Sequence, residues 1–112
     1  MNIKINMPTQ NTNSIHVKIL TIIGDIPFGR VATYGQIASK ASIQDTRIVS
    51  YALSNLKYTN KESVPWHRVV NRFGKISPRG KNSMGLQMQL LQEEGVIFDS
   101  TESIDLEKFG WK

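Results

Sequence analysis

Two short segments with helical spacing, separated by a four-residue turn, constrain the fold of this chain more than any other feature. Thr33 to Gln36 has the T-x-x-Q spacing of a capping box, which predicts a helix from there to about Lys40. After a turn at 41–44, Ser42 or Asp45 starts a second helix that runs to about residue 57. The apolar residues of this second helix form one stripe at Ile48, Val49, Ala52, Leu53 and Leu56. Two short helices joined in this way indicate a helix-turn-helix.

The face of the second helix opposite this stripe is polar and is expected to be exposed. It carries Arg47, Ser50, Tyr51, Ser54 and Asn55. In a helix-turn-helix the second helix docks on DNA, and small serines on its exposed face would let it approach a groove closely. A plain helical hairpin with an ordinary polar outer face is the alternative interpretation of the same pattern.

The segment that precedes this helix pair divides into two parts. Residues 1–13 are polar and aperiodic, and they are expected to form a flexible tail. Asn13 or Ser14 then caps a first helix, in which isoleucines recur at helical spacing until Gly24 and Pro27 end it.

The C-terminal half is expected to contain a β hairpin followed by a long helix. The segment 64–70 is β-prone, and a turn at 71–74 predicts a return as a second strand over 75–77. A last long helix is expected to start at Asn82 or Ser83 and to end at Gly95. A short strand over 96–98 and a helical turn over 105–109 complete the predicted elements.

These elements predict one compact domain over residues 14–112, because 112 residues are too few for two. The predicted fold class is mainly α with a small β hairpin, that is, a winged helix-turn-helix-like domain of the DNA-binding kind. No internal repeat or linker interrupts it.

Composition excludes several functions. The chain has no cysteine, which rules out disulfides, thiolate metal sites and a cysteine nucleophile. It has no apolar run of about 18 residues, so a membrane span is excluded. The first fourteen residues contain no apolar core, so a secretory signal is not expected. We expect neither a cofactor nor a metal site.

Charge is distributed unevenly along the chain. Fourteen basic and nine acidic residues give a net charge of +5. Seven bases and one acid lie between Lys57 and Lys81, whereas six acids and no base lie between Glu93 and Glu107. This polarity predicts a surface attracted to a polyanion on one side, and nucleic acid is the commonest such partner.

The segment Val64-Pro65-Trp66-His67-Arg68-Val69-Val70 is the most unusual in composition. A buried histidine in such a place is more often structural than catalytic, and Glu94 is a plausible carboxylate partner for it. Trp66 is either a core aromatic or a flat wall on which a base stacks, a contact worth roughly 1–3 kcal/mol per base.

Four segments resemble the O6-alkylguanine-DNA alkyltransferases. VPWHRVVN followed by Gly74 resembles their active-site strand, whose motif is P-C-H-R-V. IPFGRVATYGQIA is similar to their I-P-x-G-x-V-x-(S/T)-Y-G-x-(I/L)-A segment. TRIVSYALSN resembles the recognition helix R-x-V-G-x-A-(L/M)-x-x-N, with the asparagine one residue early, and LLQEEGV resembles the helix end L-L-x-x-E-G-(V/A). The segments stand in the family's order over about residues 15–98.

The chain departs from the enzymes at the position that decides their chemistry. Trp66 stands where the nucleophilic cysteine of the family stands, and this replacement defines the alkyltransferase-like proteins, which the chain resembles more closely. Alkyl transfer needs a thiolate, and an indole has no lone pair suited to that displacement. After Ser77 the chain gives PRGKNS in place of the enzymes' glycine-rich G-N-Y-S-G-G loop, so no contact is assigned to that loop.

The resemblance implies a role for each matching residue. The lesion pocket would be formed by Trp66, Tyr34, Val69 and Leu53. The recognition helix would enter the minor groove, with Arg47 taking the place of the extruded nucleotide; a plain phosphate contact is the alternative for that arginine. The remaining residues assigned to DNA contacts are Ser50, Tyr51, Ser54, Asn55, Arg68, Arg72 and Lys75. For Arg72 and Lys75 a solvated face is the alternative. His67 and Glu94 match the family's relay and are expected to remain as a hydrogen-bonded scaffold.

The resulting hypothesis is a non-enzymatic lesion sensor. It would bind double-stranded DNA containing O6-alkylguanine, flip the damaged base and flag it for nucleotide excision repair proteins, as a monomer in the cytoplasm, associated with the bacterial nucleoid. Two alternatives remain open. One is a weak dealkylase that uses His67 and water; the other is a sequence-specific winged-helix transcription regulator, which usually dimerises.

Overall fold

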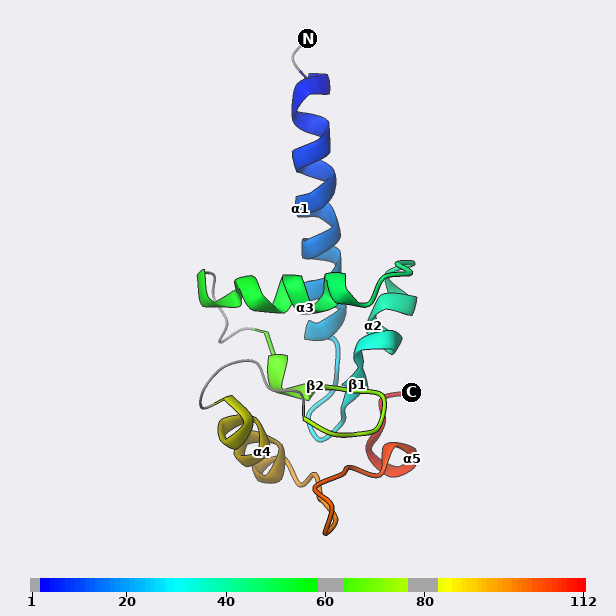
Figure 1. Cartoon of the computed structure of the whole chain (residues 1–112), viewed down its shortest axis with the longest axis vertical. Helices are drawn as coiled ribbons and strands as arrows, with labels where there is room; N and C mark the ends of the chain where they lie inside the picture. The colour runs from blue at the N-terminus through cyan, green and yellow to red at the C-terminus, as the bar shows by residue number, and fades with distance from the viewer. Residues whose placement is uncertain (1–2, 59–63, 77–82) are drawn as a thin grey trace.

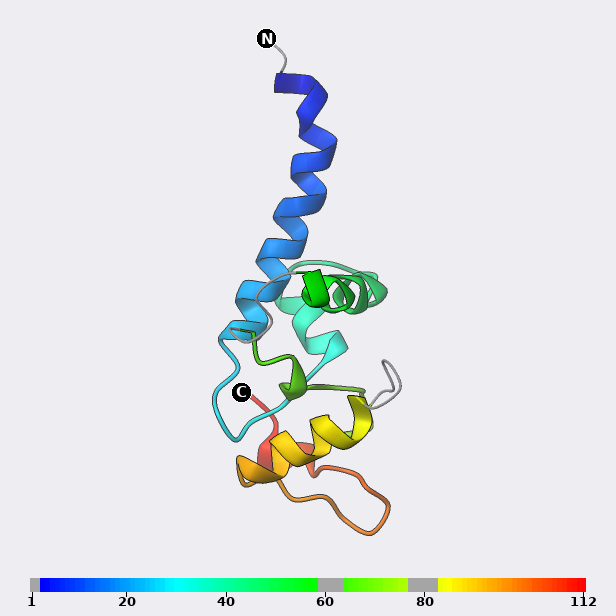
Figure 2. The ribbon, with the colours of Figure 1, turned by 90° about the vertical axis from the view of Figure 1, so that its left-hand side faces the viewer.

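Helices make up most of the structure, a computed structural model that describes residues 3–58, 64–76 and 83–112. In chain order the elements are α1 (Ile3–Gly24), β1 (Ala32–Thr33), α2 (Tyr34–Lys40), α3 (Arg47–Ser54), the 3-10 helices η1 (Asn55–Tyr58) and η3 (Trp66–Arg68), β2 (Val69–Val70), α4 (Ser83–Glu93) and α5 (Leu106–Phe109). Helix α3 crosses the lower part of α1, while α4 and α5 lie at the opposite end of the body (Figures 1 and 2). The predicted fold class, mainly helical with a small β component, is confirmed.

The two strands lie between two groups of buried side chains. They pair in parallel, with Ala32 opposite Val69 and Thr33 opposite Val70. Because neighbouring residues of a strand point to opposite faces, Ala32 and Val69 pack against the α1–α3 side, whereas Val31 and Val70 pack against the α4 side. The group on the α4 side is completed by Leu91, Val96 and Ile104.

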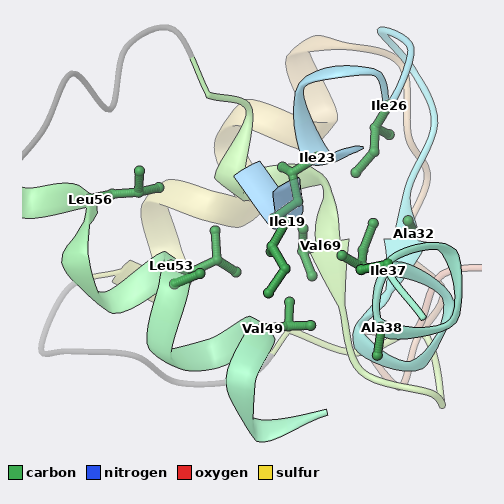
Figure 3. Close-up of a cluster of buried hydrophobic side chains, with 12 residues drawn as sticks. Ile19, Ile23, Ile26, Ala32, Ile37, Ala38, Val49, Leu53, Leu56 and Val69 are labelled. Atoms are coloured by element: carbon green, nitrogen blue, oxygen red, sulfur yellow. The ribbon is translucent and has the colours of Figure 1, made fainter. Parts of the chain in front are cut away.

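The larger core forms where α1, α2 and α3 meet (Figure 3). Each helix contributes the apolar side chains that its spacing predicts, and these are Ile19 and Ile23 from α1, Ile37 and Ala38 from α2, and Val49, Ala52 and Leu53 from α3. Burying a side chain of the larger type stabilises the fold by about 1.5–3 kcal/mol. The predicted stripe of the second helix is therefore confirmed as its packing face.

The helix-turn-helix is present as α2 and α3. Thr33 caps α2 as predicted, since its hydroxyl accepts a hydrogen bond from the Gln36 backbone N–H at 3.1 Å. The side chain of Gln36 does not return to Thr33; it donates to the backbone carbonyl of Trp111 at 2.8 Å and so ties the C-terminus to α2. Helix α3 is shorter than predicted, because it gives way to η1 at Asn55.

The β component differs from the predicted hairpin. Residues 66–68 form a 3-10 turn, so only Val69 and Val70 are extended. A tight turn follows, in which the Asn71 N–H donates to the Lys75 carbonyl at 2.9 Å, but residues 75 and 76 form no strand. Val69 and Val70 are fully buried and pair with β1 inside the domain. Strand β2 therefore pairs with a distant segment and not with the residues that follow the turn, as it would in the predicted wing. Ser77, the last residue of the predicted return strand, lies outside the described residues.

Two further boundaries differ from the predictions. Helix α1 starts at Ile3 instead of Asn13 or Ser14, and its N-terminal part, predicted as a tail, extends away from the body (Figure 2). The predicted strand at 96–98 is reduced to a bridge between Phe98 and Ile104. Among the helices that the structure describes, none has the length and apolar character needed to cross a membrane.

Gly74 is the position where the turn after β2 demands glycine. Its φ is +77°, and an added Cβ would overlap the carbonyl oxygen of Ile104. The backbone N–H of Ile104 donates a hydrogen bond to the Gly74 carbonyl at 2.8 Å, so the two segments are held close together. We therefore expect Gly74→Ala to lower the free energy of unfolding by about 1–3 kcal/mol, measured by urea denaturation.

Gly35→Ala is the matched control, because this helical glycine has no atom within 4 Å of an added Cβ. It should leave stability unchanged or raise it by up to about 1 kcal/mol. Equal effects of the two substitutions would contradict the assignment of Gly74.

Candidate functional site

The carboxylate of Glu94 joins three segments that are distant in sequence. One oxygen accepts the Gly29 backbone N–H at 2.8 Å, and the other lies 2.7 Å from His67 Nε2. Both oxygens accept from the Arg68 guanidinium, at 2.8 to 3.1 Å. Glu94 thus links the turn after α1, the 3-10 helix η3 and the end of α4. The pairing of His67 with Glu94, a plausible contact in the sequence analysis, is present in the structure.

Glu94 is held as an ion despite its burial. Its side chain is only 7% exposed, and burial alone would raise the pKa of its carboxyl group. The hydrogen bonds from Arg68, Gly29 and His67 outweigh that effect and lower the pKa of Glu94 below its ordinary value. A charged carboxylate with this many donors is a rigid anchor for the segments that it bonds.

Arg68 does not fit its predicted role as a DNA contact. Its Nε and Nη2 donate to Glu94, and its Nη1 donates to the carbonyl of Ile26 at 2.8 Å. The side chain is only 15% exposed, and every guanidinium nitrogen has a partner inside the protein. Arg68 is therefore a structural residue that neutralises a buried carboxylate.

Gln87 of α4 is a site residue that the sequence analysis missed. It is 1% exposed, and its side-chain amide donates to the carbonyls of His67 and Val69, each at 2.9 Å. The available signal was its position four residues before Leu91, on the same face of the helix as that apolar residue. Together with Glu94, Gln87 fixes the backbone on the C-terminal side of Trp66.

Two of the predicted pocket residues lie in the core. Val69 is fully buried, and its carbonyl is occupied by Gln87. Leu53 is 4% exposed and packs within the α1–α3 core (Figure 3). Neither side chain can form the wall of an open pocket, because Leu53 lies on the apolar stripe of α3 and Val69 faces the core from β2.

Trp66 and Tyr34, the other two predicted pocket residues, lie at the edge of the core. Each is half-buried and packs against the same α1–α3 core, Trp66 from η3 and Tyr34 from the first residue of α2. The indole of Trp66 meets the His67 ring edge-on, with centroids 6.0 Å apart. Trp66 is thus a supported aromatic surface next to the Glu94 anchor.

The outer face of α3 carries the predicted polar set. Arg47, Ser50, Tyr51, Ser54 and Asn55 are all exposed. The Ser54 hydroxyl donates to the Ser50 carbonyl at 2.9 Å, which keeps this small side chain folded against the helix. The Arg47 side chain is 75% exposed and pairs with Asp45 at 2.8 Å. Hydrogen bonds from Arg47 hold the pKa of Asp45 below its ordinary value.

The other two predicted DNA contacts lie on the turn after β2, not on α3. Arg72 is exposed and its guanidinium stacks on the Phe73 ring at 4.8 Å. Lys75 is exposed and donates to the Thr101 carbonyl at 3.1 Å. A cavity of about 270 Å³ adjoins Lys75, but its lining does not include Trp66 or Tyr34. Among the described residues, no cluster of histidine, aspartate and glutamate side chains has the arrangement to hold a metal ion.

Comparison with known proteins gives consistent matches. Residues 14–96 match the family model of the 6-O-methylguanine DNA methyltransferase DNA-binding domain. The chain is 40% identical over 97 residues to a DNA base-flipping protein of Vibrio parahaemolyticus, covering 86% of this chain and 94% of that one. It is 36% identical over 107 residues to alkyltransferase-like protein 1 of Schizosaccharomyces pombe, covering 89% and 96%.

The structure also superposes on a solved complex. The crystal structure of S. pombe Atl1 with damaged DNA containing O6-carboxymethylguanine matches with a TM-score of 0.77 and 33% sequence identity. The match covers 89% of this chain and 96% of that chain.

The Glu94 anchor generates a stability prediction. Glu94→Gln keeps the size of the side chain but leaves Arg68 without its counter-charge, which should cost about 3 kcal/mol. The folded-state pKa of Glu94 is lowered, so ionised Glu94 stabilises the fold. This stabilisation is complete above the ordinary pKa of about 4.3 and is lost as pH falls through the folded-state pKa. Urea unfolding over this pH range should show that loss in the wild type and not in the variant.

Glu93→Gln is the matched control. Glu93 is the neighbouring, exposed carboxylate, which accepts a hydrogen bond from the Gln89 side chain at 3.2 Å. It should change stability by no more than about 0.5 kcal/mol. If both variants behaved alike, Glu94 would not be the anchor.

Proposed function

Because the chain belongs to the 6-O-methylguanine DNA methyltransferase DNA-binding-domain family, and within it to the alkyltransferase-like proteins, we propose that it binds duplex DNA containing O6-alkylguanine and flips the damaged base without removing the alkyl group. The observation that carries this proposal is the match to Atl1 bound to damaged DNA over nearly the whole of both chains. Two features of the structure support the proposal: the exposed face of α3, which can contact DNA, and the Trp66 segment held by Glu94, which can receive the base.

The absence of chemistry follows from the residues around Trp66. The chain has no cysteine, so no thiolate is available to accept an alkyl group. His67 bonds Glu94, and Glu94 is already shared with Arg68 and Gly29. In this arrangement the histidine and the carboxylate serve as a scaffold, because a relay without a nucleophile has nothing to activate.

Helix α3 supplies the DNA-reading surface. Its exposed face is uncharged except at Arg47, and the small Ser50 and Ser54 allow the helix to lie close to a groove. Extruding a nucleotide costs a few kcal/mol and costs least for a damaged, poorly paired base. An inserted Arg47 guanidinium fills the vacated space, where its planar group can stack and donate hydrogen bonds.

Trp66 and Tyr34 form the walls that receive the flipped base. Both are partly exposed aromatic side chains supported by the core, and an indole offers apolar area to an alkyl substituent. Bulkier adducts should therefore bind at least as well as methyl. Val69 and Leu53 are buried in the core against which Trp66 and Tyr34 pack.

A base that is held and not repaired must be passed to another system. We assign nucleotide excision repair proteins as the partners, with this protein acting as a monomer on the bacterial chromosome. In this role binding energy alone distinguishes damaged from normal DNA, so lesion selectivity is the property to measure.

The proposal is tested with two duplexes that differ by a single O6-methylguanine. In fluorescence-anisotropy titrations at one salt concentration, the wild type should prefer the damaged duplex by about tenfold or more. Trp66→Ala should weaken binding to the damaged duplex by about 5- to 150-fold, the equivalent of a lost stacking contact, with little change on the undamaged one. Trp66→Phe, which keeps an aromatic surface, should lie between the two.

Trp111→Ala serves as the control, because the other tryptophan packs against the same core at the C-terminus. It should affect both duplexes equally. Equal affinity of the wild type for both duplexes would reject lesion binding and favour a sequence-specific regulator. Equal loss on both duplexes with Trp66→Ala would show that Trp66 is only a core residue.

A further inference from the structure

Asp45 places a negative charge beside the surface that would meet DNA. It is the only acidic residue in the sequence between Asp25 and Glu62, and it lies two positions before Arg47. A carboxylate at this place repels phosphate, so it opposes the binding that α3 is proposed to perform. A neutral asparagine could accept the same backbone hydrogen bond, so the negative charge at this position needs a separate explanation.

The geometry links this carboxylate directly to Arg47. One oxygen accepts both the backbone N–H and the Nε of Arg47, each at 3.0 Å. The other accepts from Nη2 at 2.8 Å and from Nε at 3.3 Å. Asp45 thus binds the first residue of α3 at its main chain and at its guanidinium together.

The charge of the pair adds little to stability, and the capping bond to the Arg47 backbone N–H does not require a charge. The two side chains are 75% and 44% exposed, and ion pairs exposed to this degree shift an equilibrium by up to about fivefold. A change of that size matters little for folding. It is large enough to alter a ratio of affinities for two DNA duplexes.

We propose that Asp45 is a positioning residue that holds Arg47 away from undamaged DNA and so sharpens the selection of lesions. The proposal rests on the proposed function, in which α3 reads DNA and Arg47 enters the vacated stack. On an undamaged duplex, the phosphates must compete with Asp45 for the guanidinium. At a lesion, the extruded base leaves a space that gives Arg47 stacking and hydrogen bonds in exchange for its bond to Asp45.

Asp45→Asn isolates the charge from the capping role, because an asparagine side-chain oxygen can still accept the Arg47 backbone N–H. The variant should bind the undamaged duplex about three- to fivefold more tightly at low salt. Its affinity for the O6-methylguanine duplex should rise less, so the selectivity ratio falls. Binding of the undamaged duplex should also depend more steeply on salt concentration, because Arg47 becomes free to neutralise a phosphate.

A double-mutant cycle on the undamaged duplex distinguishes this role from general repulsion. The cycle compares wild type, Asp45→Asn, Arg47→Ala and the double variant. In the Arg47→Ala background the gain from Asp45→Asn should shrink to less than twofold. Glu107→Gln, which removes the same charge from α5 at the other end of the body, should leave affinity unchanged (Figure 1).

Two results would overturn the proposal: no gain from Asp45→Asn, or an equal gain with and without Arg47. The cycle needs no lesion, so its outcome is separate from the test of the proposed function. A wild type without lesion selectivity would reject the function, whereas an absent coupling between Asp45 and Arg47 would reject only the role of Asp45.

Discussion

The buried carboxylate of Glu94 is the interaction on which the rest of this structure depends. It bonds the turn after α1 through Gly29 and the 3-10 helix η3 through His67 and Arg68. Burying such an ion is costly, and the cost is offset only when every lone pair finds a good donor. Here an arginine, a histidine and a main-chain N–H supply those donors. The resulting arrangement orders three segments around one point and determines where Trp66 can lie.

In the proposed function, this anchor lets a fold shared with alkyltransferases serve for binding alone. The residues that would assist a thiol remain bonded to each other, while the residue before His67 is an indole packed edge-on against it. In the proposed function, the hydrogen bonds of Glu94 hold Trp66, the wall of the pocket, in a fixed position. Gln87 contributes in the same way, since it bonds the carbonyls on either side of Arg68.

Local patterns predicted the packing face of α3, the start of α2 and the end of α4, although α1 begins earlier and α3 ends earlier than expected. The stripe from Ile48 to Leu56, the Thr33 cap and the helix that ends before Gly95 all depend on residues within a few positions of each other. Long-range pairing was not predictable in this way. The turn at Asn71 suggested a hairpin, but the strand at Val69 pairs with Ala32, 37 positions earlier in the chain.

The same limit applies to the candidate site. The family resemblance placed Trp66, Tyr34 and Arg47, and the structure leaves all three at least partly exposed. The assignment of Arg68 to a DNA contact could not take account of its burial, because that burial depends on Glu94, 26 residues away. Gln87 was missed for a related reason: a glutamine on a helix face gives no sign of being buried until its two carbonyl partners are known.

The most direct test of this account is the mass of both molecules after a stable complex forms. The protein and a duplex containing O6-methylguanine would be incubated at equal concentration well above the dissociation constant, and the intact masses of the protein and of both DNA strands would then be determined. We predict that the duplex is bound and that all masses are unchanged. A protein that gains a methyl group, or a DNA strand that loses one, would contradict the claim that this fold recognises the lesion without chemistry.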